Sequence, residues 1–306
     1  MRCIIIYFSL TGNTEKVAKA VQNGVKKEAG HCDIVKIKEA NPQDLYQYDL
    51  IGLGSLVLGV EPLNVKNFVN NLRFVGGKHA FAFCTHGTHP ELFFPGLVPL
   101  LKSRGLTVIG TRDWYGNCPF MPQPYHTYGH PDEVDLKEAE EFGQEMVDRS
   151  RKIFSGETSL IPPVPQILPG MPERKVLDPC SHDIRFQDVV KFHKEKCRYP
   201  KCRLCMEICP VDGIDLTVDP PVISKPCANC MFCSMICPAG AIDGSEFHNI
   251  MAAKSKRDIG GFLESALKEA EAKGLFRRLI PADKVGSLPR PSQSSKHPYW
   301  IIGKSL

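Results

Sequence analysis

Eight of the chain's 13 cysteines lie between Cys197 and Cys237, and this spacing restricts how that part of the chain can fold. The stretch reads CRYPKCRLCMEICP from Cys197 and CANCMFCSMICP from Cys227. Three cysteines of the first run recur in the second at one constant offset. The pairs are Cys202 and Cys230, Cys205 and Cys233, and Cys209 and Cys237. Thiolates at such short spacings need a multivalent iron or zinc partner, so we expect a metal-bound segment.

The pattern favours iron over zinc. Structural zinc would use two Cys-x2-Cys pairs and would leave the Cys-Pro steps at Cys209 and Cys237 without a role. Disulfides are less expected, because the sequence shows no secretory leader and a thiol-rich intracellular protein stays reduced. Two runs of this kind are typical of two cubane iron–sulfur clusters, in which the fourth cysteine of each run ligates the other run's cluster.

Residues 180–245 resemble the two-cluster bacterial ferredoxin domain. The resemblance implies one 4Fe-4S cluster held by Cys197, Cys202, Cys205 and Cys237. It implies a second 4Fe-4S cluster held by Cys209, Cys227, Cys230 and Cys233. One departure is that four residues separate Cys197 from Cys202, where the family usually has two. We expect the insertion within 198–201 to bulge outward and leave Cys197 a ligand, with Cys180 as the alternative.

The front of the chain contains a strand, a polar glycine loop and a helix in succession. Residues 3–8 are a continuous apolar run, typical of a strand buried on both faces. The loop residues are Ser9, Thr11, Gly12, Asn13 and Thr14. This geometry presents N–H groups and hydroxyls to an anion at a helix N-terminus. We expect positive φ at Gly12 and a helix cap at Thr14. A nucleotide triphosphatase is excluded, because the loop has no lysine and no P-loop pattern.

The loop resembles the FMN phosphate loop of flavodoxins, [S/T]-x-T-G-x-T, and it matches at every defined position. Further strands are expected at 33–37, 50–54, 80–84 and 106–111, with helices near 63–73, 91–104 and 132–154. Alternating strands and helices predict an α/β fold with a parallel sheet. The resemblance covers residues 1–155 and implies a doubly wound five-stranded sheet of order 2-1-3-4-5.

Flavodoxins flank the flavin ring with two further loops. The first corresponds here to Ser55, Leu56, Val57, Leu58 and Gly59, and the second to Thr85, His86 and Gly87. The first loop offers aliphatic rather than aromatic side chains. His86 either hydrogen-bonds the flavin and tunes its redox behaviour or is an ordinary satisfied loop histidine. The aromatic span from Trp114 to Tyr128 covers the flavin, packs between domains, or is an ordinary long loop with its own core.

Length and composition predict about two domains. We expect a flavin domain at 1–155, a Pro-rich linker at 156–180, a cluster domain at 181–250, and a helix and basic tail at 251–306. The linker is either a semi-rigid spacer or an arm packed on one domain. An apolar stripe predicts a helix over 258–274, and Trp300 could anchor the tail. No apolar stretch is long enough to span a membrane, so we expect a cytoplasmic protein.

Charge is unevenly distributed. The net charge is +4, whereas residues 251–306 hold 11 Lys and Arg against 5 Asp and Glu. Basic residues also surround the first cysteine run: Lys191, Lys194, Lys196, Arg198, Lys201 and Arg203. They form either a solvated face or a docking surface for acidic protein redox partners. Nucleic acid is not expected, because no basic-aromatic motif is present, and a homodimer is possible.

The chain as a whole resembles flavodoxin–ferredoxin fusion proteins of anaerobic bacteria and archaea. The resemblance implies an electron carrier with FMN and two 4Fe-4S clusters, and we predict no catalytic residues. The alternative is a flavin-dependent oxidoreductase that acts on NAD(P)H, a quinone or another small molecule. The glycines at 52, 54 and 59 do not complete a dinucleotide fingerprint.

Overall fold

The computed structural model describes all residues except 119–125, 219–220, 224–226 and 286–306. The described chain divides into two compact units. The first comprises Met1–Cys118 and Thr127–Met171, and the second comprises the rest of the described chain. Among the described residues, no helix is long and apolar enough to cross a membrane.

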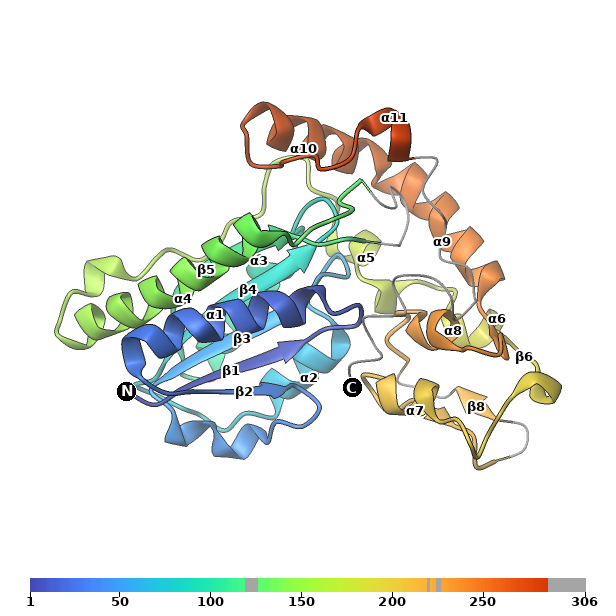
Figure 1. Ribbon diagram of the computed structural model, residues 1–306, viewed down its shortest axis with the longest axis horizontal. Coiled ribbons are helices and arrows are strands. Elements are labelled where there is room, and N and C mark those ends of the chain that lie inside the picture. Colours follow the sequence, from blue (N-terminus) through green and yellow to red (C-terminus); the bar gives the residue numbers. More distant parts are fainter. Residues whose placement is uncertain (119–125, 219–220, 224–226, 286–306) are drawn as a thin grey trace. The chain divides into compact units, whose positions relative to one another are not determined.

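The first unit is built on five parallel strands: β1 (Cys3–Phe8), β2 (Cys32–Lys36), β3 (Leu50–Leu56), β4 (His79–His86) and β5 (Thr107–Tyr115). Their order is β2-β1-β3-β4-β5, which confirms the predicted order (Figure 1). Buried apolar runs such as CIIIYF in β1 form these strands because both faces of the sheet are covered. The register pairs Phe8 with Ser55 and His86 with Tyr115, so the carboxyl ends of β1, β3, β4 and β5 lie at one edge.

Helices α1 (Asn13–Ala29) and α4 (Glu133–Phe154) pack side by side over Ile5, Phe81 and Phe83 on one face of this sheet. Helices α2 (Leu63–Asn70) and α3 (Phe93–Ser103) cover the other face, where alternate strand residues are also buried. Gly24 and Gly143 let α1 and α4 approach closely. A Cβ at Gly24 would lie 1.8 Å from the Glu140 carbonyl oxygen, and one at Gly143 would lie 2.2 Å from that of Val21.

Strand β5 is longer than predicted and includes Trp114 and Tyr115. Trp114 is only 3% exposed and packs edge-on against Phe83 and Phe142, with centroid separations of 6.4 and 5.8 Å. The interpretation of this side chain as a cofactor cover is therefore wrong, because it belongs to the core beneath α4. Residues 119–125 of the same aromatic span lie outside the described residues.

The Pro-rich segment begins on the first unit. Leu160 and Ile161 pack against its core, and residues 161–165 line a surface hollow with Val108 and Thr111. The part of this segment next to α4 therefore lies on the first unit as an arm.

The second unit contains two small antiparallel sheets. One pairs β6 (Lys191–Phe192) with β9 (Ile242–Asp243), and the other pairs β7 (Ile214–Asp215) with β8 (Val222–Ile223). Helices α7 (Leu204–Ile208) and α8 (Phe232–Ile236) are offset along the chain by the same interval as the paired cysteines, and so are β7 and β9. The cysteine repeat is therefore also a repeat of secondary structure. Phe186 and Phe247 pack edge-on at 5.5 Å in the core of this unit.

Two longer helices follow, α9 (Ser245–Asp258) and α10 (Gly260–Ala272). The helix predicted over 258–274 corresponds to α10, whereas α9 was not predicted and contains the expected domain boundary at 250. The remaining helical segments are short: α5 (Arg174–Leu177), α6 (Phe186–Val189), α11 (Ala282–Val285), η1 (Pro42–Gln47), η2 (Thr158–Leu160), η3 (Pro179–Ser181) and η4 (Lys194–Lys196). Trp300 and the predicted tail anchor lie outside the described residues.

Candidate functional site

The polar loop between β1 and α1 has the backbone of an anion cradle. Gly12 has φ 88°, as expected, and its N–H donates to the Ser9 hydroxyl at 3.1 Å. Helix α1 begins at Asn13 without a side-chain cap. The N–H groups of its first turn therefore keep their donor capacity and the positive end of the helix dipole.

Thr14 does not cap α1, so that prediction is wrong. Its hydroxyl oxygen lies 2.7 Å from the Thr85 hydroxyl oxygen, and both side chains are buried. The reason is positional: Thr14 already lies within α1, one residue after its first residue, and faces the end of β4. This contact joins two of the predicted site loops.

The two predicted ring loops also meet. The Val57 N–H donates to the Thr85 carbonyl at 3.2 Å, and the Leu92 N–H donates to the Gly59 carbonyl at 3.1 Å. Ser55 is fully buried and its hydroxyl donates to the Leu56 carbonyl at 2.7 Å. The structure thus brings all three predicted loops together at the carboxyl edge of the sheet, where ligands of doubly wound folds bind.

A fourth segment, which follows β5, joins this edge; the sequence predicted a cofactor cover here as one alternative, but not these contacts. The Asn13 side-chain amide donates to the Asn117 carbonyl at 2.9 Å. A Cβ at Gly116 would lie 3.3 Å from the Cβ atoms of both Asn13 and Thr85, and one at Gly87 would lie 2.6 Å from the Cβ of Cys118. Ligands of doubly wound folds bind at the carboxyl ends of the strands, and this rule, applied to β5, could have pointed to these contacts.

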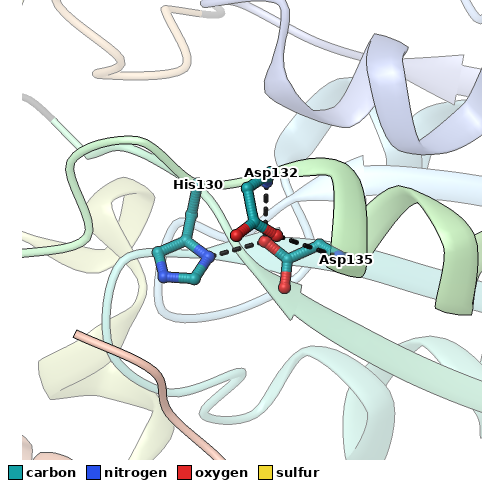
Figure 2. Close-up of side chains that lie close together, drawn as sticks. All are labelled: His130, Asp132 and Asp135. Carbon is teal, nitrogen blue, oxygen red and sulfur yellow. Dashed lines mark hydrogen bonds and ion pairs between the residues drawn. The ribbon is translucent and has the colours of Figure 1, made fainter. Parts of the chain in front are cut away.

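The same segment is anchored at the start of α4 (Figure 2). Asp132 accepts from the N–H groups of Val134 and Asp135 at 3.0 and 3.1 Å, and Asp135 accepts from the Asp132 N–H at 2.8 Å. Asp135 also lies 2.6 Å from Nδ1 of the buried His130. The carbonyl of His130 accepts from the Asn117 N–H at 2.9 Å. A helix capping box therefore explains why these three side chains cluster, and it fixes the segment beside Asn13.

His86, at the end of β4, is paired with Asp113 of β5. Its Nε2 lies 2.8 Å from Oδ2 of Asp113, and the edge of the Tyr115 ring contacts the imidazole at 4.7 Å. Burial acts to raise the pKa of Asp113, but the hydrogen bond and charge of His86 outweigh it and hold that pKa below its ordinary value. Nδ1 of His86 is buried without a partner in the described chain. Nε2 of His86 is thus hydrogen-bonded within the protein, whereas Nδ1 has no partner among the described residues.

The eight clustered cysteines line two small cavities. The first cavity is lined by Cys197, Cys202, Cys205 and Cys237, among other residues. The second is lined by Cys209, Cys227, Cys230 and Cys233, among others. Each cavity therefore takes three cysteines from one run and one from the other run. Cys180 lines neither of them.

The separation of the sulfur atoms does not suit a single metal ion. A tetrahedral zinc site with Zn–S bonds of about 2.3 Å holds its sulfurs about 3.8 Å apart. In the described part of the chain, no three cysteine sulfur atoms lie within 4.8 Å of one another. The cysteine sulfurs around each cavity are therefore too widely spaced in this structure to coordinate one tetrahedral ion.

Backbone N–H groups are directed at the sulfur atoms in both repeats. The Gly213 N–H donates to Sγ of Cys209 and the Ala241 N–H donates to Sγ of Cys237, both at 3.2 Å and at equivalent positions of the repeat. Such bonds stabilise negative charge on sulfur. Burial, with a smaller contribution from the neighbouring cysteine thiols, raises the pKa of Cys205 to about 11 and that of Cys230 to about 12, so binding of a metal group must displace their protons.

A preceding segment is fastened to the second cysteine loop. The Arg185 guanidinium donates to the carbonyls of Cys180 and Cys227 at 2.6 and 2.9 Å. The Asn229 amide donates to the Pro179 carbonyl at 2.7 Å, and its oxygen accepts from the Phe186 N–H at 3.1 Å. We call residues 179–186 the strap. Nothing in the sequence pattern predicted it.

The fold and the polar loop together define a doubly wound α/β protein with an anion-binding edge. A family model described as "Flavodoxin domain" matches residues 4–95. The flavodoxin of Megasphaera elsdenii is 31% identical over 111 residues, which cover 35% of this chain and 81% of that protein. The chain therefore belongs to the flavodoxin family through its N-terminal unit.

Two further relatives match other or longer stretches. The ferredoxin of Methanothermococcus thermolithotrophicus is 35% identical over 59 residues, which cover 19% of this chain and 98% of that protein. A protein of Archaeoglobus fulgidus named NAD(P)H dehydrogenase (quinone) is 25% identical over 191 residues, which cover 50% of this chain and 98% of that protein.

Proposed function

We propose that this protein is a cytoplasmic electron carrier that binds FMN in its first unit and two 4Fe-4S clusters in its second. It relays single electrons between these cofactors and protein redox partners in anaerobic, low-potential metabolism. The observation that carries this proposal is the division of eight cysteines, four and four, between two cavities in the crosswise pattern of two-cluster ferredoxins. The short ferredoxin match supports it.

The loop after β1 fits the phosphate of FMN. Ser9 and Thr11 are partly exposed hydroxyl residues beside the uncapped first turn of α1, so their hydroxyls and the turn's N–H groups can bind an anion. Gly12 supplies the positive φ that the turn requires. Residues 55–59 and 85–87 lie beside this loop and would hold the ring. The bound flavin would supply two-electron storage beside one-electron clusters.

The residues around both sites bind and tune rather than catalyse. The polar side chains of the first unit's edge are engaged in hydrogen bonds between loops, as Thr14 and Asn13 show. In the second unit, backbone N–H groups donate hydrogen bonds to sulfur atoms. These bonds stabilise negative charge on sulfur and need no proton transfer. This matches a protein that orients cofactors and sets their potentials.

A flavin-dependent oxidoreductase is the second candidate, and the relative named NAD(P)H dehydrogenase (quinone) favours it. The two functions differ in one measurement. Anaerobic mixing of the purified protein with NAD(P)H should leave the flavin absorbance unchanged on the millisecond to second scale if the protein is a carrier. Rapid bleaching without any partner protein would identify the oxidoreductase instead.

The inventory of cofactors tests the proposal directly. Protein purified without oxygen should contain one FMN, about eight irons and about eight sulfides per chain. Substitution Cys197→Ser should lower iron to about four, because Cys197 lines the first cavity. The matched variant Cys180→Ser should keep the full iron content, because Cys180 lines neither cavity. The reverse pattern would make Cys180 the ligand.

A further inference from the structure

A surface hollow adjoins the first cysteine cavity. It is lined by Arg198, Tyr199, Pro200, Lys201, Cys202 and Pro238. Four of these residues are the ones that separate Cys197 from Cys202, so the extended spacing of the first run forms most of the hollow. The second run is two residues shorter at the corresponding place, because only Ala228 and Asn229 separate Cys227 from Cys230.

The hollow and the first cysteine cavity lie next to each other. Arg198, Cys202 and Pro238 line both the hollow and the first cysteine cavity. The Cys202 side chain therefore lies between the surface and any group in that cavity. Electron transfer slows steeply with distance, so the Cys202 side chain is a short path between a cluster in this cavity and a molecule seated in the hollow.

The hollow is strongly basic. Residues 194–203 contain five Lys or Arg and one acidic residue. Lys196, Arg198 and Lys201 are exposed, and none of the three has an acidic partner among the described side chains. Arg203 stacks over the Tyr199 ring at 5.7 Å, which adds an apolar and cationic rim. Exposed cations without partners attract an acidic surface and raise its encounter rate.

The second cavity has no wall in common with the hollow in the described chain. Its walls include Phe186, Met231 and Phe232, and it shares no lining residue with the hollow. The strap is hydrogen-bonded to its cysteine loop through Arg185 and Asn229. The hollow therefore adjoins the first group of cysteines and not the second.

We propose that the hollow at residues 198–202 is the docking site of an acidic protein redox partner, which exchanges electrons with the first cluster through Cys202. The proposal rests on the two clusters of the proposed function and adds the surface and the chemistry of the partner. Carboxylates of the partner pair with Lys196, Arg198 and Lys201. Its redox centre then lies next to the Cys202 sulfur.

Charge reversal tests this docking site. The variant Lys196→Glu/Lys201→Glu is compared with Lys254→Glu/Lys256→Glu, which changes the net charge equally on α9. Dithionite-reduced protein is mixed with an oxidised acidic [2Fe–2S] ferredoxin, and electron transfer is followed by stopped-flow absorbance. We expect a rate about tenfold lower and a weaker salt dependence for the first variant, and a change of less than about twofold for the second. A zwitterionic viologen, which has no net charge, should react equally with both variants.

Carbodiimide cross-linking gives a second readout that needs no cluster. It should join Lys201 to a carboxylate of the ferredoxin, as identified by mass spectrometry, and high salt should abolish the product. Equal rates for the two charge reversals, or cross-links confined to lysines outside 194–203, would overturn the docking site. Absence of iron and sulfide from the wild-type protein would instead contradict the proposed function, and cross-linking would still decide the docking site. A slower reaction with ferricyanide alone would indicate an entrance for small anions and also overturn the proposal.

Discussion

Single hydroxyl and amide groups connect the loops at the edge of the first sheet. Thr14 and Thr85 come from α1 and β4, and Asn13 reaches the backbone after β5. Thr14 is 1% exposed and Thr85 is 5% exposed, so water cannot replace a lost partner. Buried pairs of this kind add little net stability when both members are present, but leaving one unpaired is costly.

The threonine pair gives a sharp test. Substitution Thr14→Val should lower the free energy of unfolding by about 1–3 kcal/mol, because the Thr85 hydroxyl loses its partner. The double variant Thr14→Val/Thr85→Val should lose less than the sum of the single variants. Urea unfolding followed by the fluorescence of the buried Trp114, in a Trp300→Phe background, measures both. Additive single effects would show that the two hydroxyls do not interact in solution.

Glu91 lies just beyond the second ring loop and has an unusual environment. It adopts φ 49°, its N–H donates to Nδ1 of His89 at 2.8 Å, and Oε2 is buried without a partner in the described chain. Burial raises the pKa of Glu91 from 4.5 to about 8. Between these pH values the folded protein retains a proton that the unfolded chain has released.

Stability should therefore fall as pH rises from about 4.5 to about 8. Substitution Glu91→Gln should remove this contribution and raise the stability at pH 8.5 by a few kcal/mol, in order of magnitude, with little change at pH 4.5. Urea unfolding at the two pH values measures the difference. As a control, Glu138→Gln changes an exposed acid on α4 and should leave the pH profile intact. An unaltered profile in Glu91→Gln would assign the pH dependence to other groups.

At the scale of elements, the pairing of α1 with α4 depends on two glycines. A Cβ at Gly24 would collide with the backbone of α4, which cannot move as a side chain can. Gly24→Ala should therefore lower the unfolding free energy of the first unit by about 2–3 kcal/mol, despite the better helix propensity of alanine. Gly261→Ala on α10 meets no atom within 4 Å and should be neutral or stabilising by up to about 1 kcal/mol. Thermal unfolding monitored by circular dichroism compares the two. Equal effects of the two substitutions would mean that α1 and α4 can move apart at Gly24 without loss of stability.

Sequence patterns predicted the elements whose residues are buried for local reasons. The strands β1, β3 and β4 are largely apolar and buried, and the strand order follows from the resemblance at the Ser9–Thr14 loop. The patterns failed where distant residues decide the structure. Trp114 looks like a loop aromatic, but its contact with Phe142, which lies far along the chain within α4, makes it a core side chain. Only Phe247 is buried in α9, so that helix has no clear apolar stripe. The contact of Asn13 with Asn117 spans 104 residues and leaves no local signal.

At the scale of the molecule, the two units have separate cores of different kinds. The first core is apolar and aromatic, with Phe81, Phe83 and Trp114 at its centre. The core of the second includes Cys205 and Cys233, and three further cysteines pack against it: Cys197, Cys209 and Cys227. If these cysteines hold the proposed clusters, we expect the second core to depend on them.

Removal of iron should therefore unfold one unit and leave the other folded. Anaerobic treatment with a strong iron chelator should abolish the visible absorbance of the clusters and expose the second unit to protease within residues 181–258. The Trp114 fluorescence, again in the Trp300→Phe background, and the flavin content should stay unchanged. Loss of all three signals in one transition would show that the units fold as one cooperative body.

Because of the internal repeat, the two halves of the second unit can be compared with each other. The sulfur bonds at Gly213 and Ala241 are equal in length and equivalent in position, so by themselves they would not make one of the two proposed clusters easier to reduce than the other. A difference in potential would come from what the repeat does not copy, such as the insertion at residues 198–201 on one side, and the Asn229 N–H bond to the Cys227 sulfur and Arg185 with its strap on the other. Selection could thus adjust the direction of electron flow by changing a few residues outside the duplicated framework while leaving all eight thiolates in place.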